Sequence, residues 1–369
     1  MTKTKIGLLF AGRSVEHEVS VTSATSIVQA LDPDRYDVVL IGIGPDGRWH
    51  LGVGEQTPAK ALGGPEVLLT ATPNGGSLIP VASNSLPEKI SLDVIVPIVH
   101  GRGGEDGALQ GLLELAEIPY VGSGVLSSSI QMDKDISKKL LEAAGLPVVP
   151  WRVIRDVELT GDNDLSASEI LKEIDLPVFV KPANSGSSVG TSKVMRAEDL
   201  LPAIEKAARY DTKVMVEKAI HAREIEIAVL GNNDAAASVP GEIVTGNTFY
   251  DYDAKYAENS TQLVIPAEIS NAHTLLVQEM ALCAFKTVAG EGMARVDFLF
   301  DRHSDAIYIN ELNSLPGFTE VSMFPRLWVA SGLAYPELLN RLIDLAIARH
   351  AMRQKLETRC PGESEASLR

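Results

Sequence analysis

Two carboxylates and an amide stand at alternate positions in two segments that are otherwise apolar. Asp297 follows Arg295 by two residues, and Asn313 follows Glu311 by two, so each pair shares one face if the segments are strands. Carboxylate and amide oxygens suit Mg²⁺, and Arg295 can stabilise the oxygens of a phosphoryl group in transfer. The spacing predicts a magnesium site that bridges phosphates, and a pair of strand-end salt bridges is the alternative.

A lysine followed by a glycine- and serine-rich loop forms the second candidate. Lys181 follows the apolar residues 178–180, and residues 184–190 then read Asn-Ser-Gly-Ser-Ser-Val-Gly. The lysine supplies a fixed positive charge and the loop supplies backbone N–H groups that no large side chain covers, so together they can hold a triphosphate. The alternative is a surface lysine before an ordinary turn.

Two further segments are candidates, one for binding a nucleoside and one for covering the site. After the apolar residues 214–216, backbone groups of residues 217–220 can meet an adenine edge and Glu224 can accept hydrogen bonds from ribose hydroxyls; alone, this segment is better interpreted as an exposed charged turn. Residues 245–262 show little periodicity yet contain four aromatic side chains. Because long irregular segments of this kind are commonly functional, we expect a covering loop that brings Lys255 and Tyr256 to a substrate.

Two glycine motifs do not carry their usual chemistry. Residues 42–47 fit G-x-G-x-x-G, but Pro-Asp-Gly at 45–47 predicts a turn and residues 48–50 a returning strand, where a dinucleotide site needs a helix. Residues 186–190 fit G-x-S-x-G, but no tight strand-to-helix turn is predicted there, as a nucleophile elbow requires. The Walker sequence G-x-x-x-x-G-K-[ST] does not occur.

The composition limits the class of protein that these residues can serve. The 369 residues carry 33 Lys plus Arg against 49 Asp plus Glu, a formal charge of −16, which disfavours nucleic-acid and membrane partners. The chain opens without a signal-peptide core, no apolar run approaches a membrane span, and two cysteines build no disulfide framework. We expect a cytoplasmic protein in which Cys283, within an apolar helical pattern, packs in the core.

The hydrophobic pattern predicts the strands and helices that must position these residues. Their order indicates an α/β region followed by α+β regions. In the first region, strands are expected at 6–10, 38–43 and 94–99 and helices at 20–31 and 107–115, which indicates an open parallel sheet; residues 52–87 are expected to be a loop-rich excursion. Later strands and helices are expected at these positions: strands 177–180, 214–216, 225–230, 295–300 and 307–309, and helices 133–144, 198–208, 272–288 and 336–350.

Seven sequence motifs, taken together, resemble the D-alanine–D-alanine ligase family of the ATP-grasp superfamily. They lie at residues 14–20, 100–107, 132–134, 179–190, 250–256, 295–297 and 311–319. The resemblance implies an ATP-grasp ligase of three domains, with an N-terminal open parallel sheet and the nucleotide held between the central and C-terminal domains. The implied divisions are an N-terminal domain at 1–133, a central domain at 134–222, a C-terminal domain at 223–350 and a flexible tail at 351–369.

The resemblance also implies a reaction. ATP phosphorylates the carboxylate of a first D-alanine, and the amine of a second attacks the resulting acyl phosphate, giving D-alanyl-D-alanine for peptidoglycan precursors. Two Mg²⁺ ions are implied, with Mn²⁺ able to substitute, in a cytoplasmic homodimer without nucleic-acid or membrane partners.

The resemblance assigns roles residue by residue. The catalytic set is Glu16, Ser187, Tyr256, Arg295 and Gly317. The substrate set is His100, Lys255, Ser322 and Met323. The nucleotide set is Lys134, Lys181, Ser187, Ser188, Glu217, Lys218, Ile220, Glu224 and Asn310, and the metal ligands are Asp297, Glu311 and Asn313.

Three other functions compete with this one. A ligase that joins D-alanine to D-lactate is disfavoured because relatives of that type depart from the Lys255-Tyr256 pattern. A ligase for another carboxylate and amine pair stays open. A nucleotide-binding regulator without turnover is disfavoured by the intact set of Arg295, Asp297, Glu311 and Asn313.

Overall fold

The N-terminal sheet is built on a buried apolar strand. The computed structural model describes residues 2–54, 57–72, 75–81, 89–155, 166–245 and 261–357. Its first strand, β1 (Thr4–Ala11), pairs in parallel with β2 (Tyr36–Ile43) and with β7 (Val94–Ile98). Helix α1 (His17–Ala30) makes the crossover from β1 to β2, so the expected α/β unit is confirmed.

Four further strands, paired antiparallel, extend this sheet beyond its parallel strands β7, β1 and β2. They are β3 (Trp49–Leu51), β4 (Glu66–Leu69), β5 (Ser77–Pro80) and β6 (Ile90–Ser91), with the short helix α2 (Pro58–Ala61) between β3 and β4. The expected loop-rich excursion therefore contains strands. Val67 and Leu78 are buried in the core of this sheet, because inward-facing apolar residues alternate with exposed ones even where Gly, Pro and Thr are frequent.

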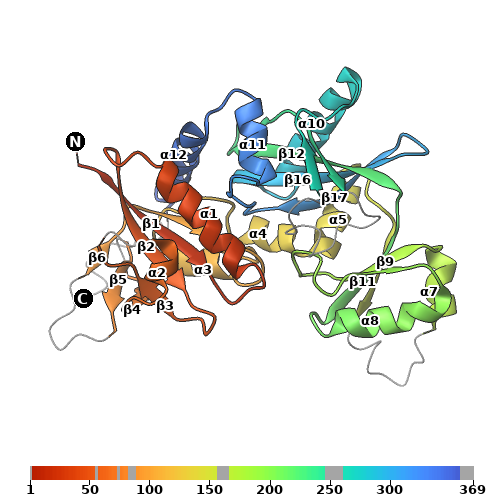
Figure 1. Ribbon diagram of the computed structural model, residues 1–369, viewed down its shortest axis with the longest axis horizontal. Coiled ribbons are helices and arrows are strands. Elements are labelled where there is room, and N and C mark those ends of the chain that lie inside the picture. Colours follow the sequence, from red (N-terminus) through yellow and green to blue (C-terminus); the bar gives the residue numbers. More distant parts are fainter. Residues whose placement is uncertain are drawn as a thin grey trace.

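Three helices lead from the first sheet toward the other two. They are α3 (Ala108–Leu115), α4 (Val125–Met132) and α5 (Lys134–Ala143). Asp133 caps α5, since its carboxylate accepts hydrogen bonds from the backbone N–H groups of Asp135 and Ile136. The helix predicted at 133–144 is confirmed, and it lies between the central and C-terminal sheets in Figure 1.

The central sheet is a small lobe with a core of its own. Its order is β10-β9-β11-β8, all antiparallel. Its strands are β8 (Trp151–Arg155), β9 (Val178–Pro182), β10 (Ser192–Val194) and β11 (Lys213–Lys218). The turn η1 (Ala197–Asp199) and the helices α7 (Ala167–Glu173) and α8 (Leu200–Ala208) complete it. This lobe is green at the lower right of Figure 1.

The C-terminal sheet carries the predicted metal residues on its last two strands. Its order is β15-β14-β12-β16-β17. These strands are β12 (Ala222–Gly231), β14 (Gly241–Thr245), β15 (Thr261–Val264), β16 (Gly292–Asp301) and β17 (Ile307–Asn313), and β13 (Ala236–Ala237) pairs with β12. Thr245 pairs with Thr261, so the segment predicted as a covering loop joins two neighbouring strands. Residues 246–260 themselves lie outside the described residues.

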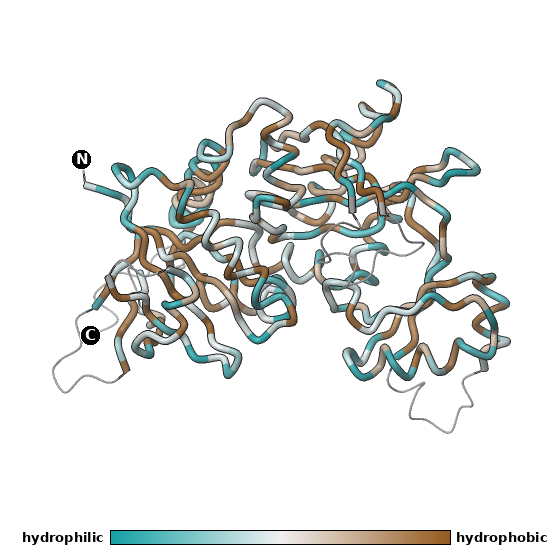
Figure 2. The backbone as a smooth tube through the Cα atoms, viewed as in Figure 1, coloured by the Kyte–Doolittle hydropathy of each residue, from teal (hydrophilic) through white to brown (hydrophobic). Residues whose placement is uncertain are grey.

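One continuous core joins the N-terminal and C-terminal sheets. Residues of β1 and α1 pack with residues of α11 (Met323–Ala330) and α12 (Tyr335–Arg353) in a single cluster. Figure 2 shows strongly hydrophobic segments running through both regions. On the other face of the C-terminal sheet lies α10 (Asn271–Thr287).

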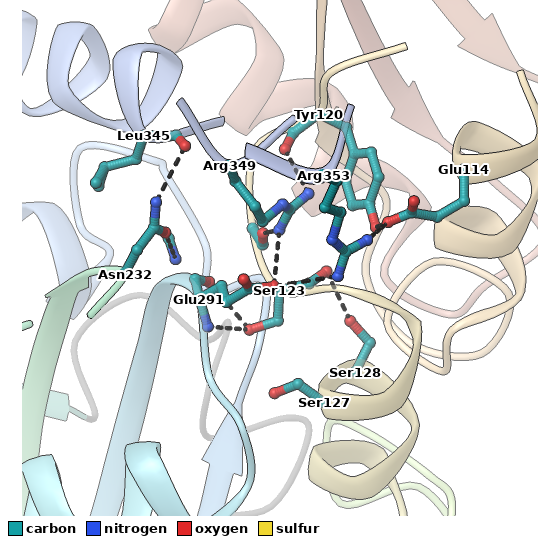
Figure 3. A network of polar contacts seen from close by, with 12 residues as sticks. Glu114, Tyr120, Ser123, Ser127, Ser128, Asn232, Glu291, Leu345, Arg349 and Arg353 are labelled. Carbon is teal, nitrogen blue, oxygen red and sulfur yellow. Dashed lines mark hydrogen bonds and ion pairs between the residues drawn. The ribbon is translucent and has the colours of Figure 1, made fainter. Parts of the chain in front are cut away.

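Polar contacts of α12 reinforce this junction (Figure 3). The buried Arg349 donates to the carbonyls of Tyr120, at 3.0 Å, and Gly122, and its guanidinium lies over the Tyr120 ring. Arg353 pairs with Glu114 on α3 and with Glu291, which precedes β16. The helix expected to end at His350 therefore continues to Arg353, whose ion pairs hold its last turn.

The position of Cys283 and the character of the helices can be compared with the sequence predictions. Cys283 is exposed on α10, so its predicted place in the core is wrong. The buried side chains of α10 include Val277, Ala281 and Ala284, and Cys283 points away from that face. Within the described residues, no helix has the length and apolar character to cross a membrane.

Candidate active site

The N-terminal region and the other two sheets contribute to one cleft of about 1120 Å³. It brings together Glu16 from the turn between β1 and α1, Lys181 from the central sheet and Glu311 from the C-terminal sheet. Every predicted site residue within the described part of the chain lines it: Glu16, His100, Lys134, Lys181, Ser187, Ser188, Glu217, Lys218, Ile220, Glu224, Arg295, Asp297, Asn310, Glu311, Asn313, Gly317, Ser322 and Met323. Lys255 and Tyr256 lie outside the described residues.

The loop after β9 lines the cleft in an unusual backbone conformation. Ser187 and Ser188 adopt positive φ values of 47° and 57°, which residues other than glycine rarely do. Ser187 Oγ donates a 2.5 Å hydrogen bond to Glu16 Oε1. A Cβ atom at Gly186 would lie 3.0 Å from Glu16 Oε2, so glycine allows the loop to approach this carboxylate.

Two lysines share one buried carboxylate beside the loop. Glu217 Oε2 lies 2.6 Å from Lys181 Nζ, and Glu217 Oε1 lies 2.5 Å from Lys138 Nζ. Burial alone would raise the pKa of Glu217, but the two ammonium groups hold it below its usual value. Glu217 was predicted as a nucleotide contact; its side chain serves the lysines, so the backbone of residues 217–220 is the part available to an adenine edge.

The predicted metal ligands meet across β16 and β17. Asp297 pairs with Glu311 in the strand register, and Asn313 Nδ2 donates a 2.9 Å hydrogen bond to Asp297 Oδ2. Lys134 Nζ lies 3.3 Å from Glu311 Oε2. Two carboxylates and an amide on adjoining strands give the hard oxygen donors that Mg²⁺ takes. The described residues contain no group of three His, Cys, Asp or Glu side chains suited to a metal, as expected when one ligand is an amide.

A β-bulge sets the directions of these side chains. The register shifts between Asp297 and Phe298, because Asp297 pairs with Glu311 while Phe298 pairs with Ile309. Asn310 is therefore the extra residue of β17, and it lines the cleft together with Glu311. Such bulges re-aim side chains next to active sites.

Arg295 is held between two carboxylates. Its Nε and Nη2 atoms each lie 2.7 Å from an oxygen of Asp297, and its Nε lies 3.0 Å from Glu226 Oε2. Burial lowers the pKa of Arg295, but Asp297 and Glu226 raise it well above its usual value. The guanidinium is thus a permanent cation fixed in the cleft, suited to phosphoryl oxygens.

His100 is fixed by the loop that follows the metal residues. Its Nδ1 lies 3.0 Å from the Leu315 carbonyl, while the Leu315 N–H donates to Glu105 Oε1 at 3.1 Å. Burial lowers the pKa of His100 and raises that of Glu105 to about 8. Nδ1 is therefore the protonated nitrogen, and the buried Nε2, without a hydrogen-bond partner among the described residues, is an acceptor.

The predicted substrate contacts Ser322 and Met323 begin α11. Ser322 Oγ accepts a 3.0 Å hydrogen bond from the Thr319 N–H, and a Cβ atom at Gly317 would lie 2.8 Å from the same oxygen. Glycine at 317 therefore keeps this turn tight and leaves its backbone open to the cleft.

Three acidic or basic side chains of the site did not follow from sequence reasoning: Lys138, Glu105 and Glu226. Lys138 lies four residues after Lys134 on α5, but this spacing alone does not distinguish a buried lysine from a solvated one. Glu226 interrupts the apolar strand predicted at 225–230 and could have been found as a buried charge that needs a partner.

Comparison with known families agrees with this arrangement. A family model described as "D-ala D-ala ligase N-terminus" matches residues 5–123, and one described as "D-ala D-ala ligase C-terminus" matches residues 140–344. The chain belongs to the D-alanine–D-alanine ligase family. The resemblance inferred from the seven motifs is thereby confirmed.

Full-length relatives and solved structures of the family are similar throughout. The D-alanine–D-alanine ligase of Heliobacterium modesticaldum is 47% identical over 364 residues, covering 97% of this chain and 98% of the relative. The ligase of Oceanobacillus iheyensis is 47% identical over 371 residues, covering 96% and 98%. The structure of the D-alanine–D-alanine ligase from Coxiella burnetii aligns with a TM-score of 0.83 at 37% identity, covering 96% and 97%.

A second solved structure differs in its printed specificity. The VanG D-Ala:D-Ser ligase from Enterococcus faecalis aligns with a TM-score of 0.82 at 33% identity, covering 94% of this chain and all of that one. The ligase fold expected from the sequence is confirmed by these neighbours.

Proposed function

We propose that this chain joins two D-alanine molecules, using ATP, to give D-alanyl-D-alanine with release of ADP and phosphate for peptidoglycan precursor synthesis. The observation that carries the proposal is the meeting of three kinds of group in one cleft. These are the cations and loop of the central lobe, the carboxylates of β16 and β17, and Glu16 from the N-terminal sheet. The identity of about 47% to named ligases over nearly the whole chain supports it.

The nucleotide lies between the central and C-terminal sheets in this proposal. Lys134, Lys181 and the N–H groups at Ser187 and Ser188 hold the phosphates, because they are the cations and open donors of that part of the cleft. The backbone of residues 217–220 meets the adenine, and Glu224 meets the ribose.

Asp297, Glu311 and Asn313 fit Mg²⁺, and Asn310 lies beside them as a further polar contact for the nucleotide. We propose two Mg²⁺ ions, with Mn²⁺ able to replace them. When bound, the metal neutralises phosphate charge and polarises the phosphoryl group. Arg295 and the Gly317 backbone then stabilise the oxygens on which charge develops during acyl transfer.

The first D-alanine is positioned by groups on the N-terminal side of the cleft. Glu16, hydrogen-bonded to Ser187, accepts from its ammonium group, and the buried Nε2 of His100 lies in the same cleft as an acceptor. Ser322 and Met323 at the start of α11 bind the carboxylate of the second D-alanine. No nucleophilic side chain is needed, because phosphorylation of the substrate carboxylate supplies the leaving group.

Residues 246–260 connect β14 to β15, and we propose that they cover the cleft during turnover. Tyr256 extends the hydrogen-bonded pair of Glu16 and Ser187, and Lys255 reaches the terminal phosphate. An acyl phosphate is hydrolysed if water reaches it, so a cover has a direct chemical purpose.

The organisation of the protein belongs to the same proposal. We propose domains at residues 1–133, 134–222 and 223–350 with a tail from 351, a homodimer and a cytoplasmic location. Exposed Leu112, Leu115, Leu126 and Met352 supply apolar surface for a second copy. Light scattering after size exclusion tests the dimer; a monomer at micromolar concentration contradicts it.

Phosphate release from ATP, with the product mass measured, tests the reaction. The amino acids offered are D-alanine alone, L-alanine alone, and D-alanine with D-lactate or D-serine. We expect phosphate release with D-alanine alone and a product with the mass of two D-alanine molecules less one water. A product that forms only with D-serine or D-lactate contradicts the proposed second substrate.

A further inference from the structure

A buried ion triad extends from the wall of the cleft into the protein behind it. Lys138 on α5 has a side chain that is 1% exposed, and Glu217 on β11 one that is 4% exposed. Lys181 on β9 is 12% exposed and reaches the cleft, whereas Lys138 does not line it. Each oxygen of Glu217 therefore has its own ammonium group, one facing the ligand and one behind.

Local charge explains why the second lysine is needed. With only Lys181, Glu217 would form a neutral pair, and no excess positive charge would remain for a phosphate. With Lys138 the triad carries a net charge of about +1, in a chain whose total is −16. The neighbouring Lys134 is already opposed by Glu311, so it does not supply that excess alone.

The pKa values of the two lysines shift in opposite directions. Burial holds the pKa of Lys138 below its usual value, although Glu217 opposes that shift. Burial also lowers the pKa of Lys181, but Glu217 and Glu311 outweigh it and raise that pKa above its usual value. A buried carboxylate stripped of one partner would draw the remaining ammonium group more tightly.

We propose that Lys138 is a positioning residue for nucleotide binding: by neutralising one oxygen of Glu217 from behind, it leaves Lys181 with positive charge to offer the phosphates. Lys138 acts through Glu217 and touches no ligand itself. The inference rests on the assignment of Lys181 to the phosphates made above, and it adds a residue that none of the predicted site sets contains.

The test compares ATP with adenosine as probes, in equilibrium titrations without D-alanine. The variant is Lys138→Met, and the matched control is Lys139→Met, one residue along α5, where the side chain is 52% exposed and pairs with Asp135. We expect Lys138→Met to weaken ATP binding about tenfold while adenosine changes by less than about twofold, and the control to change neither. Equal losses for both probes, or no loss, overturn the proposal.

A second variant keeps the test informative if Lys138→Met does not fold. The double variant Lys138→Met with Glu217→Gln removes the two buried charges behind Lys181 together and leaves the Lys181 ammonium group without its carboxylate partner. We expect its ratio of ATP to adenosine affinity to equal or exceed that of the unmodified protein; a ratio lowered about tenfold contradicts the charge argument. Lys181→Met separates the two ideas, because an unchanged ATP affinity there refutes the phosphate assignment of Lys181 rather than the role of Lys138.

Discussion

The central lobe and the rest of the molecule are stabilised in different ways. The N-terminal and C-terminal sheets share one core through α11 and α12 and are joined by the contacts of Arg349. The central lobe has a separate core of twelve buried residues, Ile154 to Val216. The carboxylates, Arg295 and Glu16 are thus carried by one body, while the lobe carries Lys181 and the serine loop.

This difference shows how the cleft divides its chemistry. The residues proposed to bind the metal and to orient the acyl transfer lie on the two sheets that share a core, which suits a reaction governed by positioning. Lys181 and the loop at residues 184–190, which are proposed to hold the phosphates, lie on the lobe with the separate core, whereas Lys134 lies on α5 outside that core. The following experiments test this division, from the largest expected effect to the smallest.

Glu311→Gln removes a charge from the C-terminal sheet and leaves the central lobe unchanged. We expect kcat to fall on the order of 10²–10³-fold, because the donor set for Mg²⁺ loses a carboxylate, while the fold is retained. Steady-state kinetics and circular dichroism provide the measurements. A kcat within about threefold of the unmodified enzyme would remove Glu311 from the metal site.

Ile204→Ala and Ile343→Ala compare the two cores. Both side chains are buried, Ile204 in the lobe and Ile343 in the shared core, so each substitution should cost about 2–5 kcal/mol. Hydrogen exchange should rise only in the central strands for Ile204→Ala, but in both β7 and β16 for Ile343→Ala. Exchange that rises equally in all three sheets in either variant would show that the lobe is not an independent unit.

Arg349→Met tests the junction between the two outer sheets. The substitution leaves the carbonyls of Tyr120 and Gly122 without their buried donor, so the free energy of unfolding should fall by about 2–4 kcal/mol. Arg341→Met, on the exposed face of the same helix, should change it by less than about 0.5 kcal/mol. Denaturant titration measures both, and equal effects would refute a special role for Arg349.

Cys283→Ser should have the smallest effect. The side chain is exposed, so we expect stability to change by less than about 0.5 kcal/mol and activity to be retained. In a Cys360→Ser background, a thiol reagent should modify the native protein at once. Protection until unfolding would instead place this thiol in the core.

The proximity of the residues proposed as metal ligands could be predicted because their order is local. Alternation along a strand places Asp297 with Arg295 and Glu311 with Asn313, and two segments close in sequence pair naturally. The bulge at Asn310 was not predictable, since a register shift depends on the partner strand. Lys138 was missed for a similar reason: a lysine on a helix is usually solvated, and only the tertiary contact with Glu217 explains its burial.

Two predictions about the fold were wrong. One segment has the composition of a loop but contains strands, and one helix has an apolar sequence that does not show which of its faces is buried. The strands β4 and β5 lie among Gly, Pro and Thr, which are typical of loops, yet Val67 and Leu78 close a core. Cys283 lies in an apolar stretch of α10, but the sequence of that stretch does not show which side of the helix is buried. The three-sheet ligase architecture followed instead from motifs spread along the whole chain.

The 2.5 Å hydrogen bond from Ser187 to Glu16 joins the central lobe to the N-terminal region. Ligands that favour this bridge on either side must help one another, and by thermodynamic linkage the assistance is equal in both directions. An amino acid seated at Glu16 would therefore raise the affinity of the serine loop for nucleotide by the same factor as nucleotide raises the affinity for the amino acid. The Ser187 hydroxyl would thus couple the binding of the two substrates.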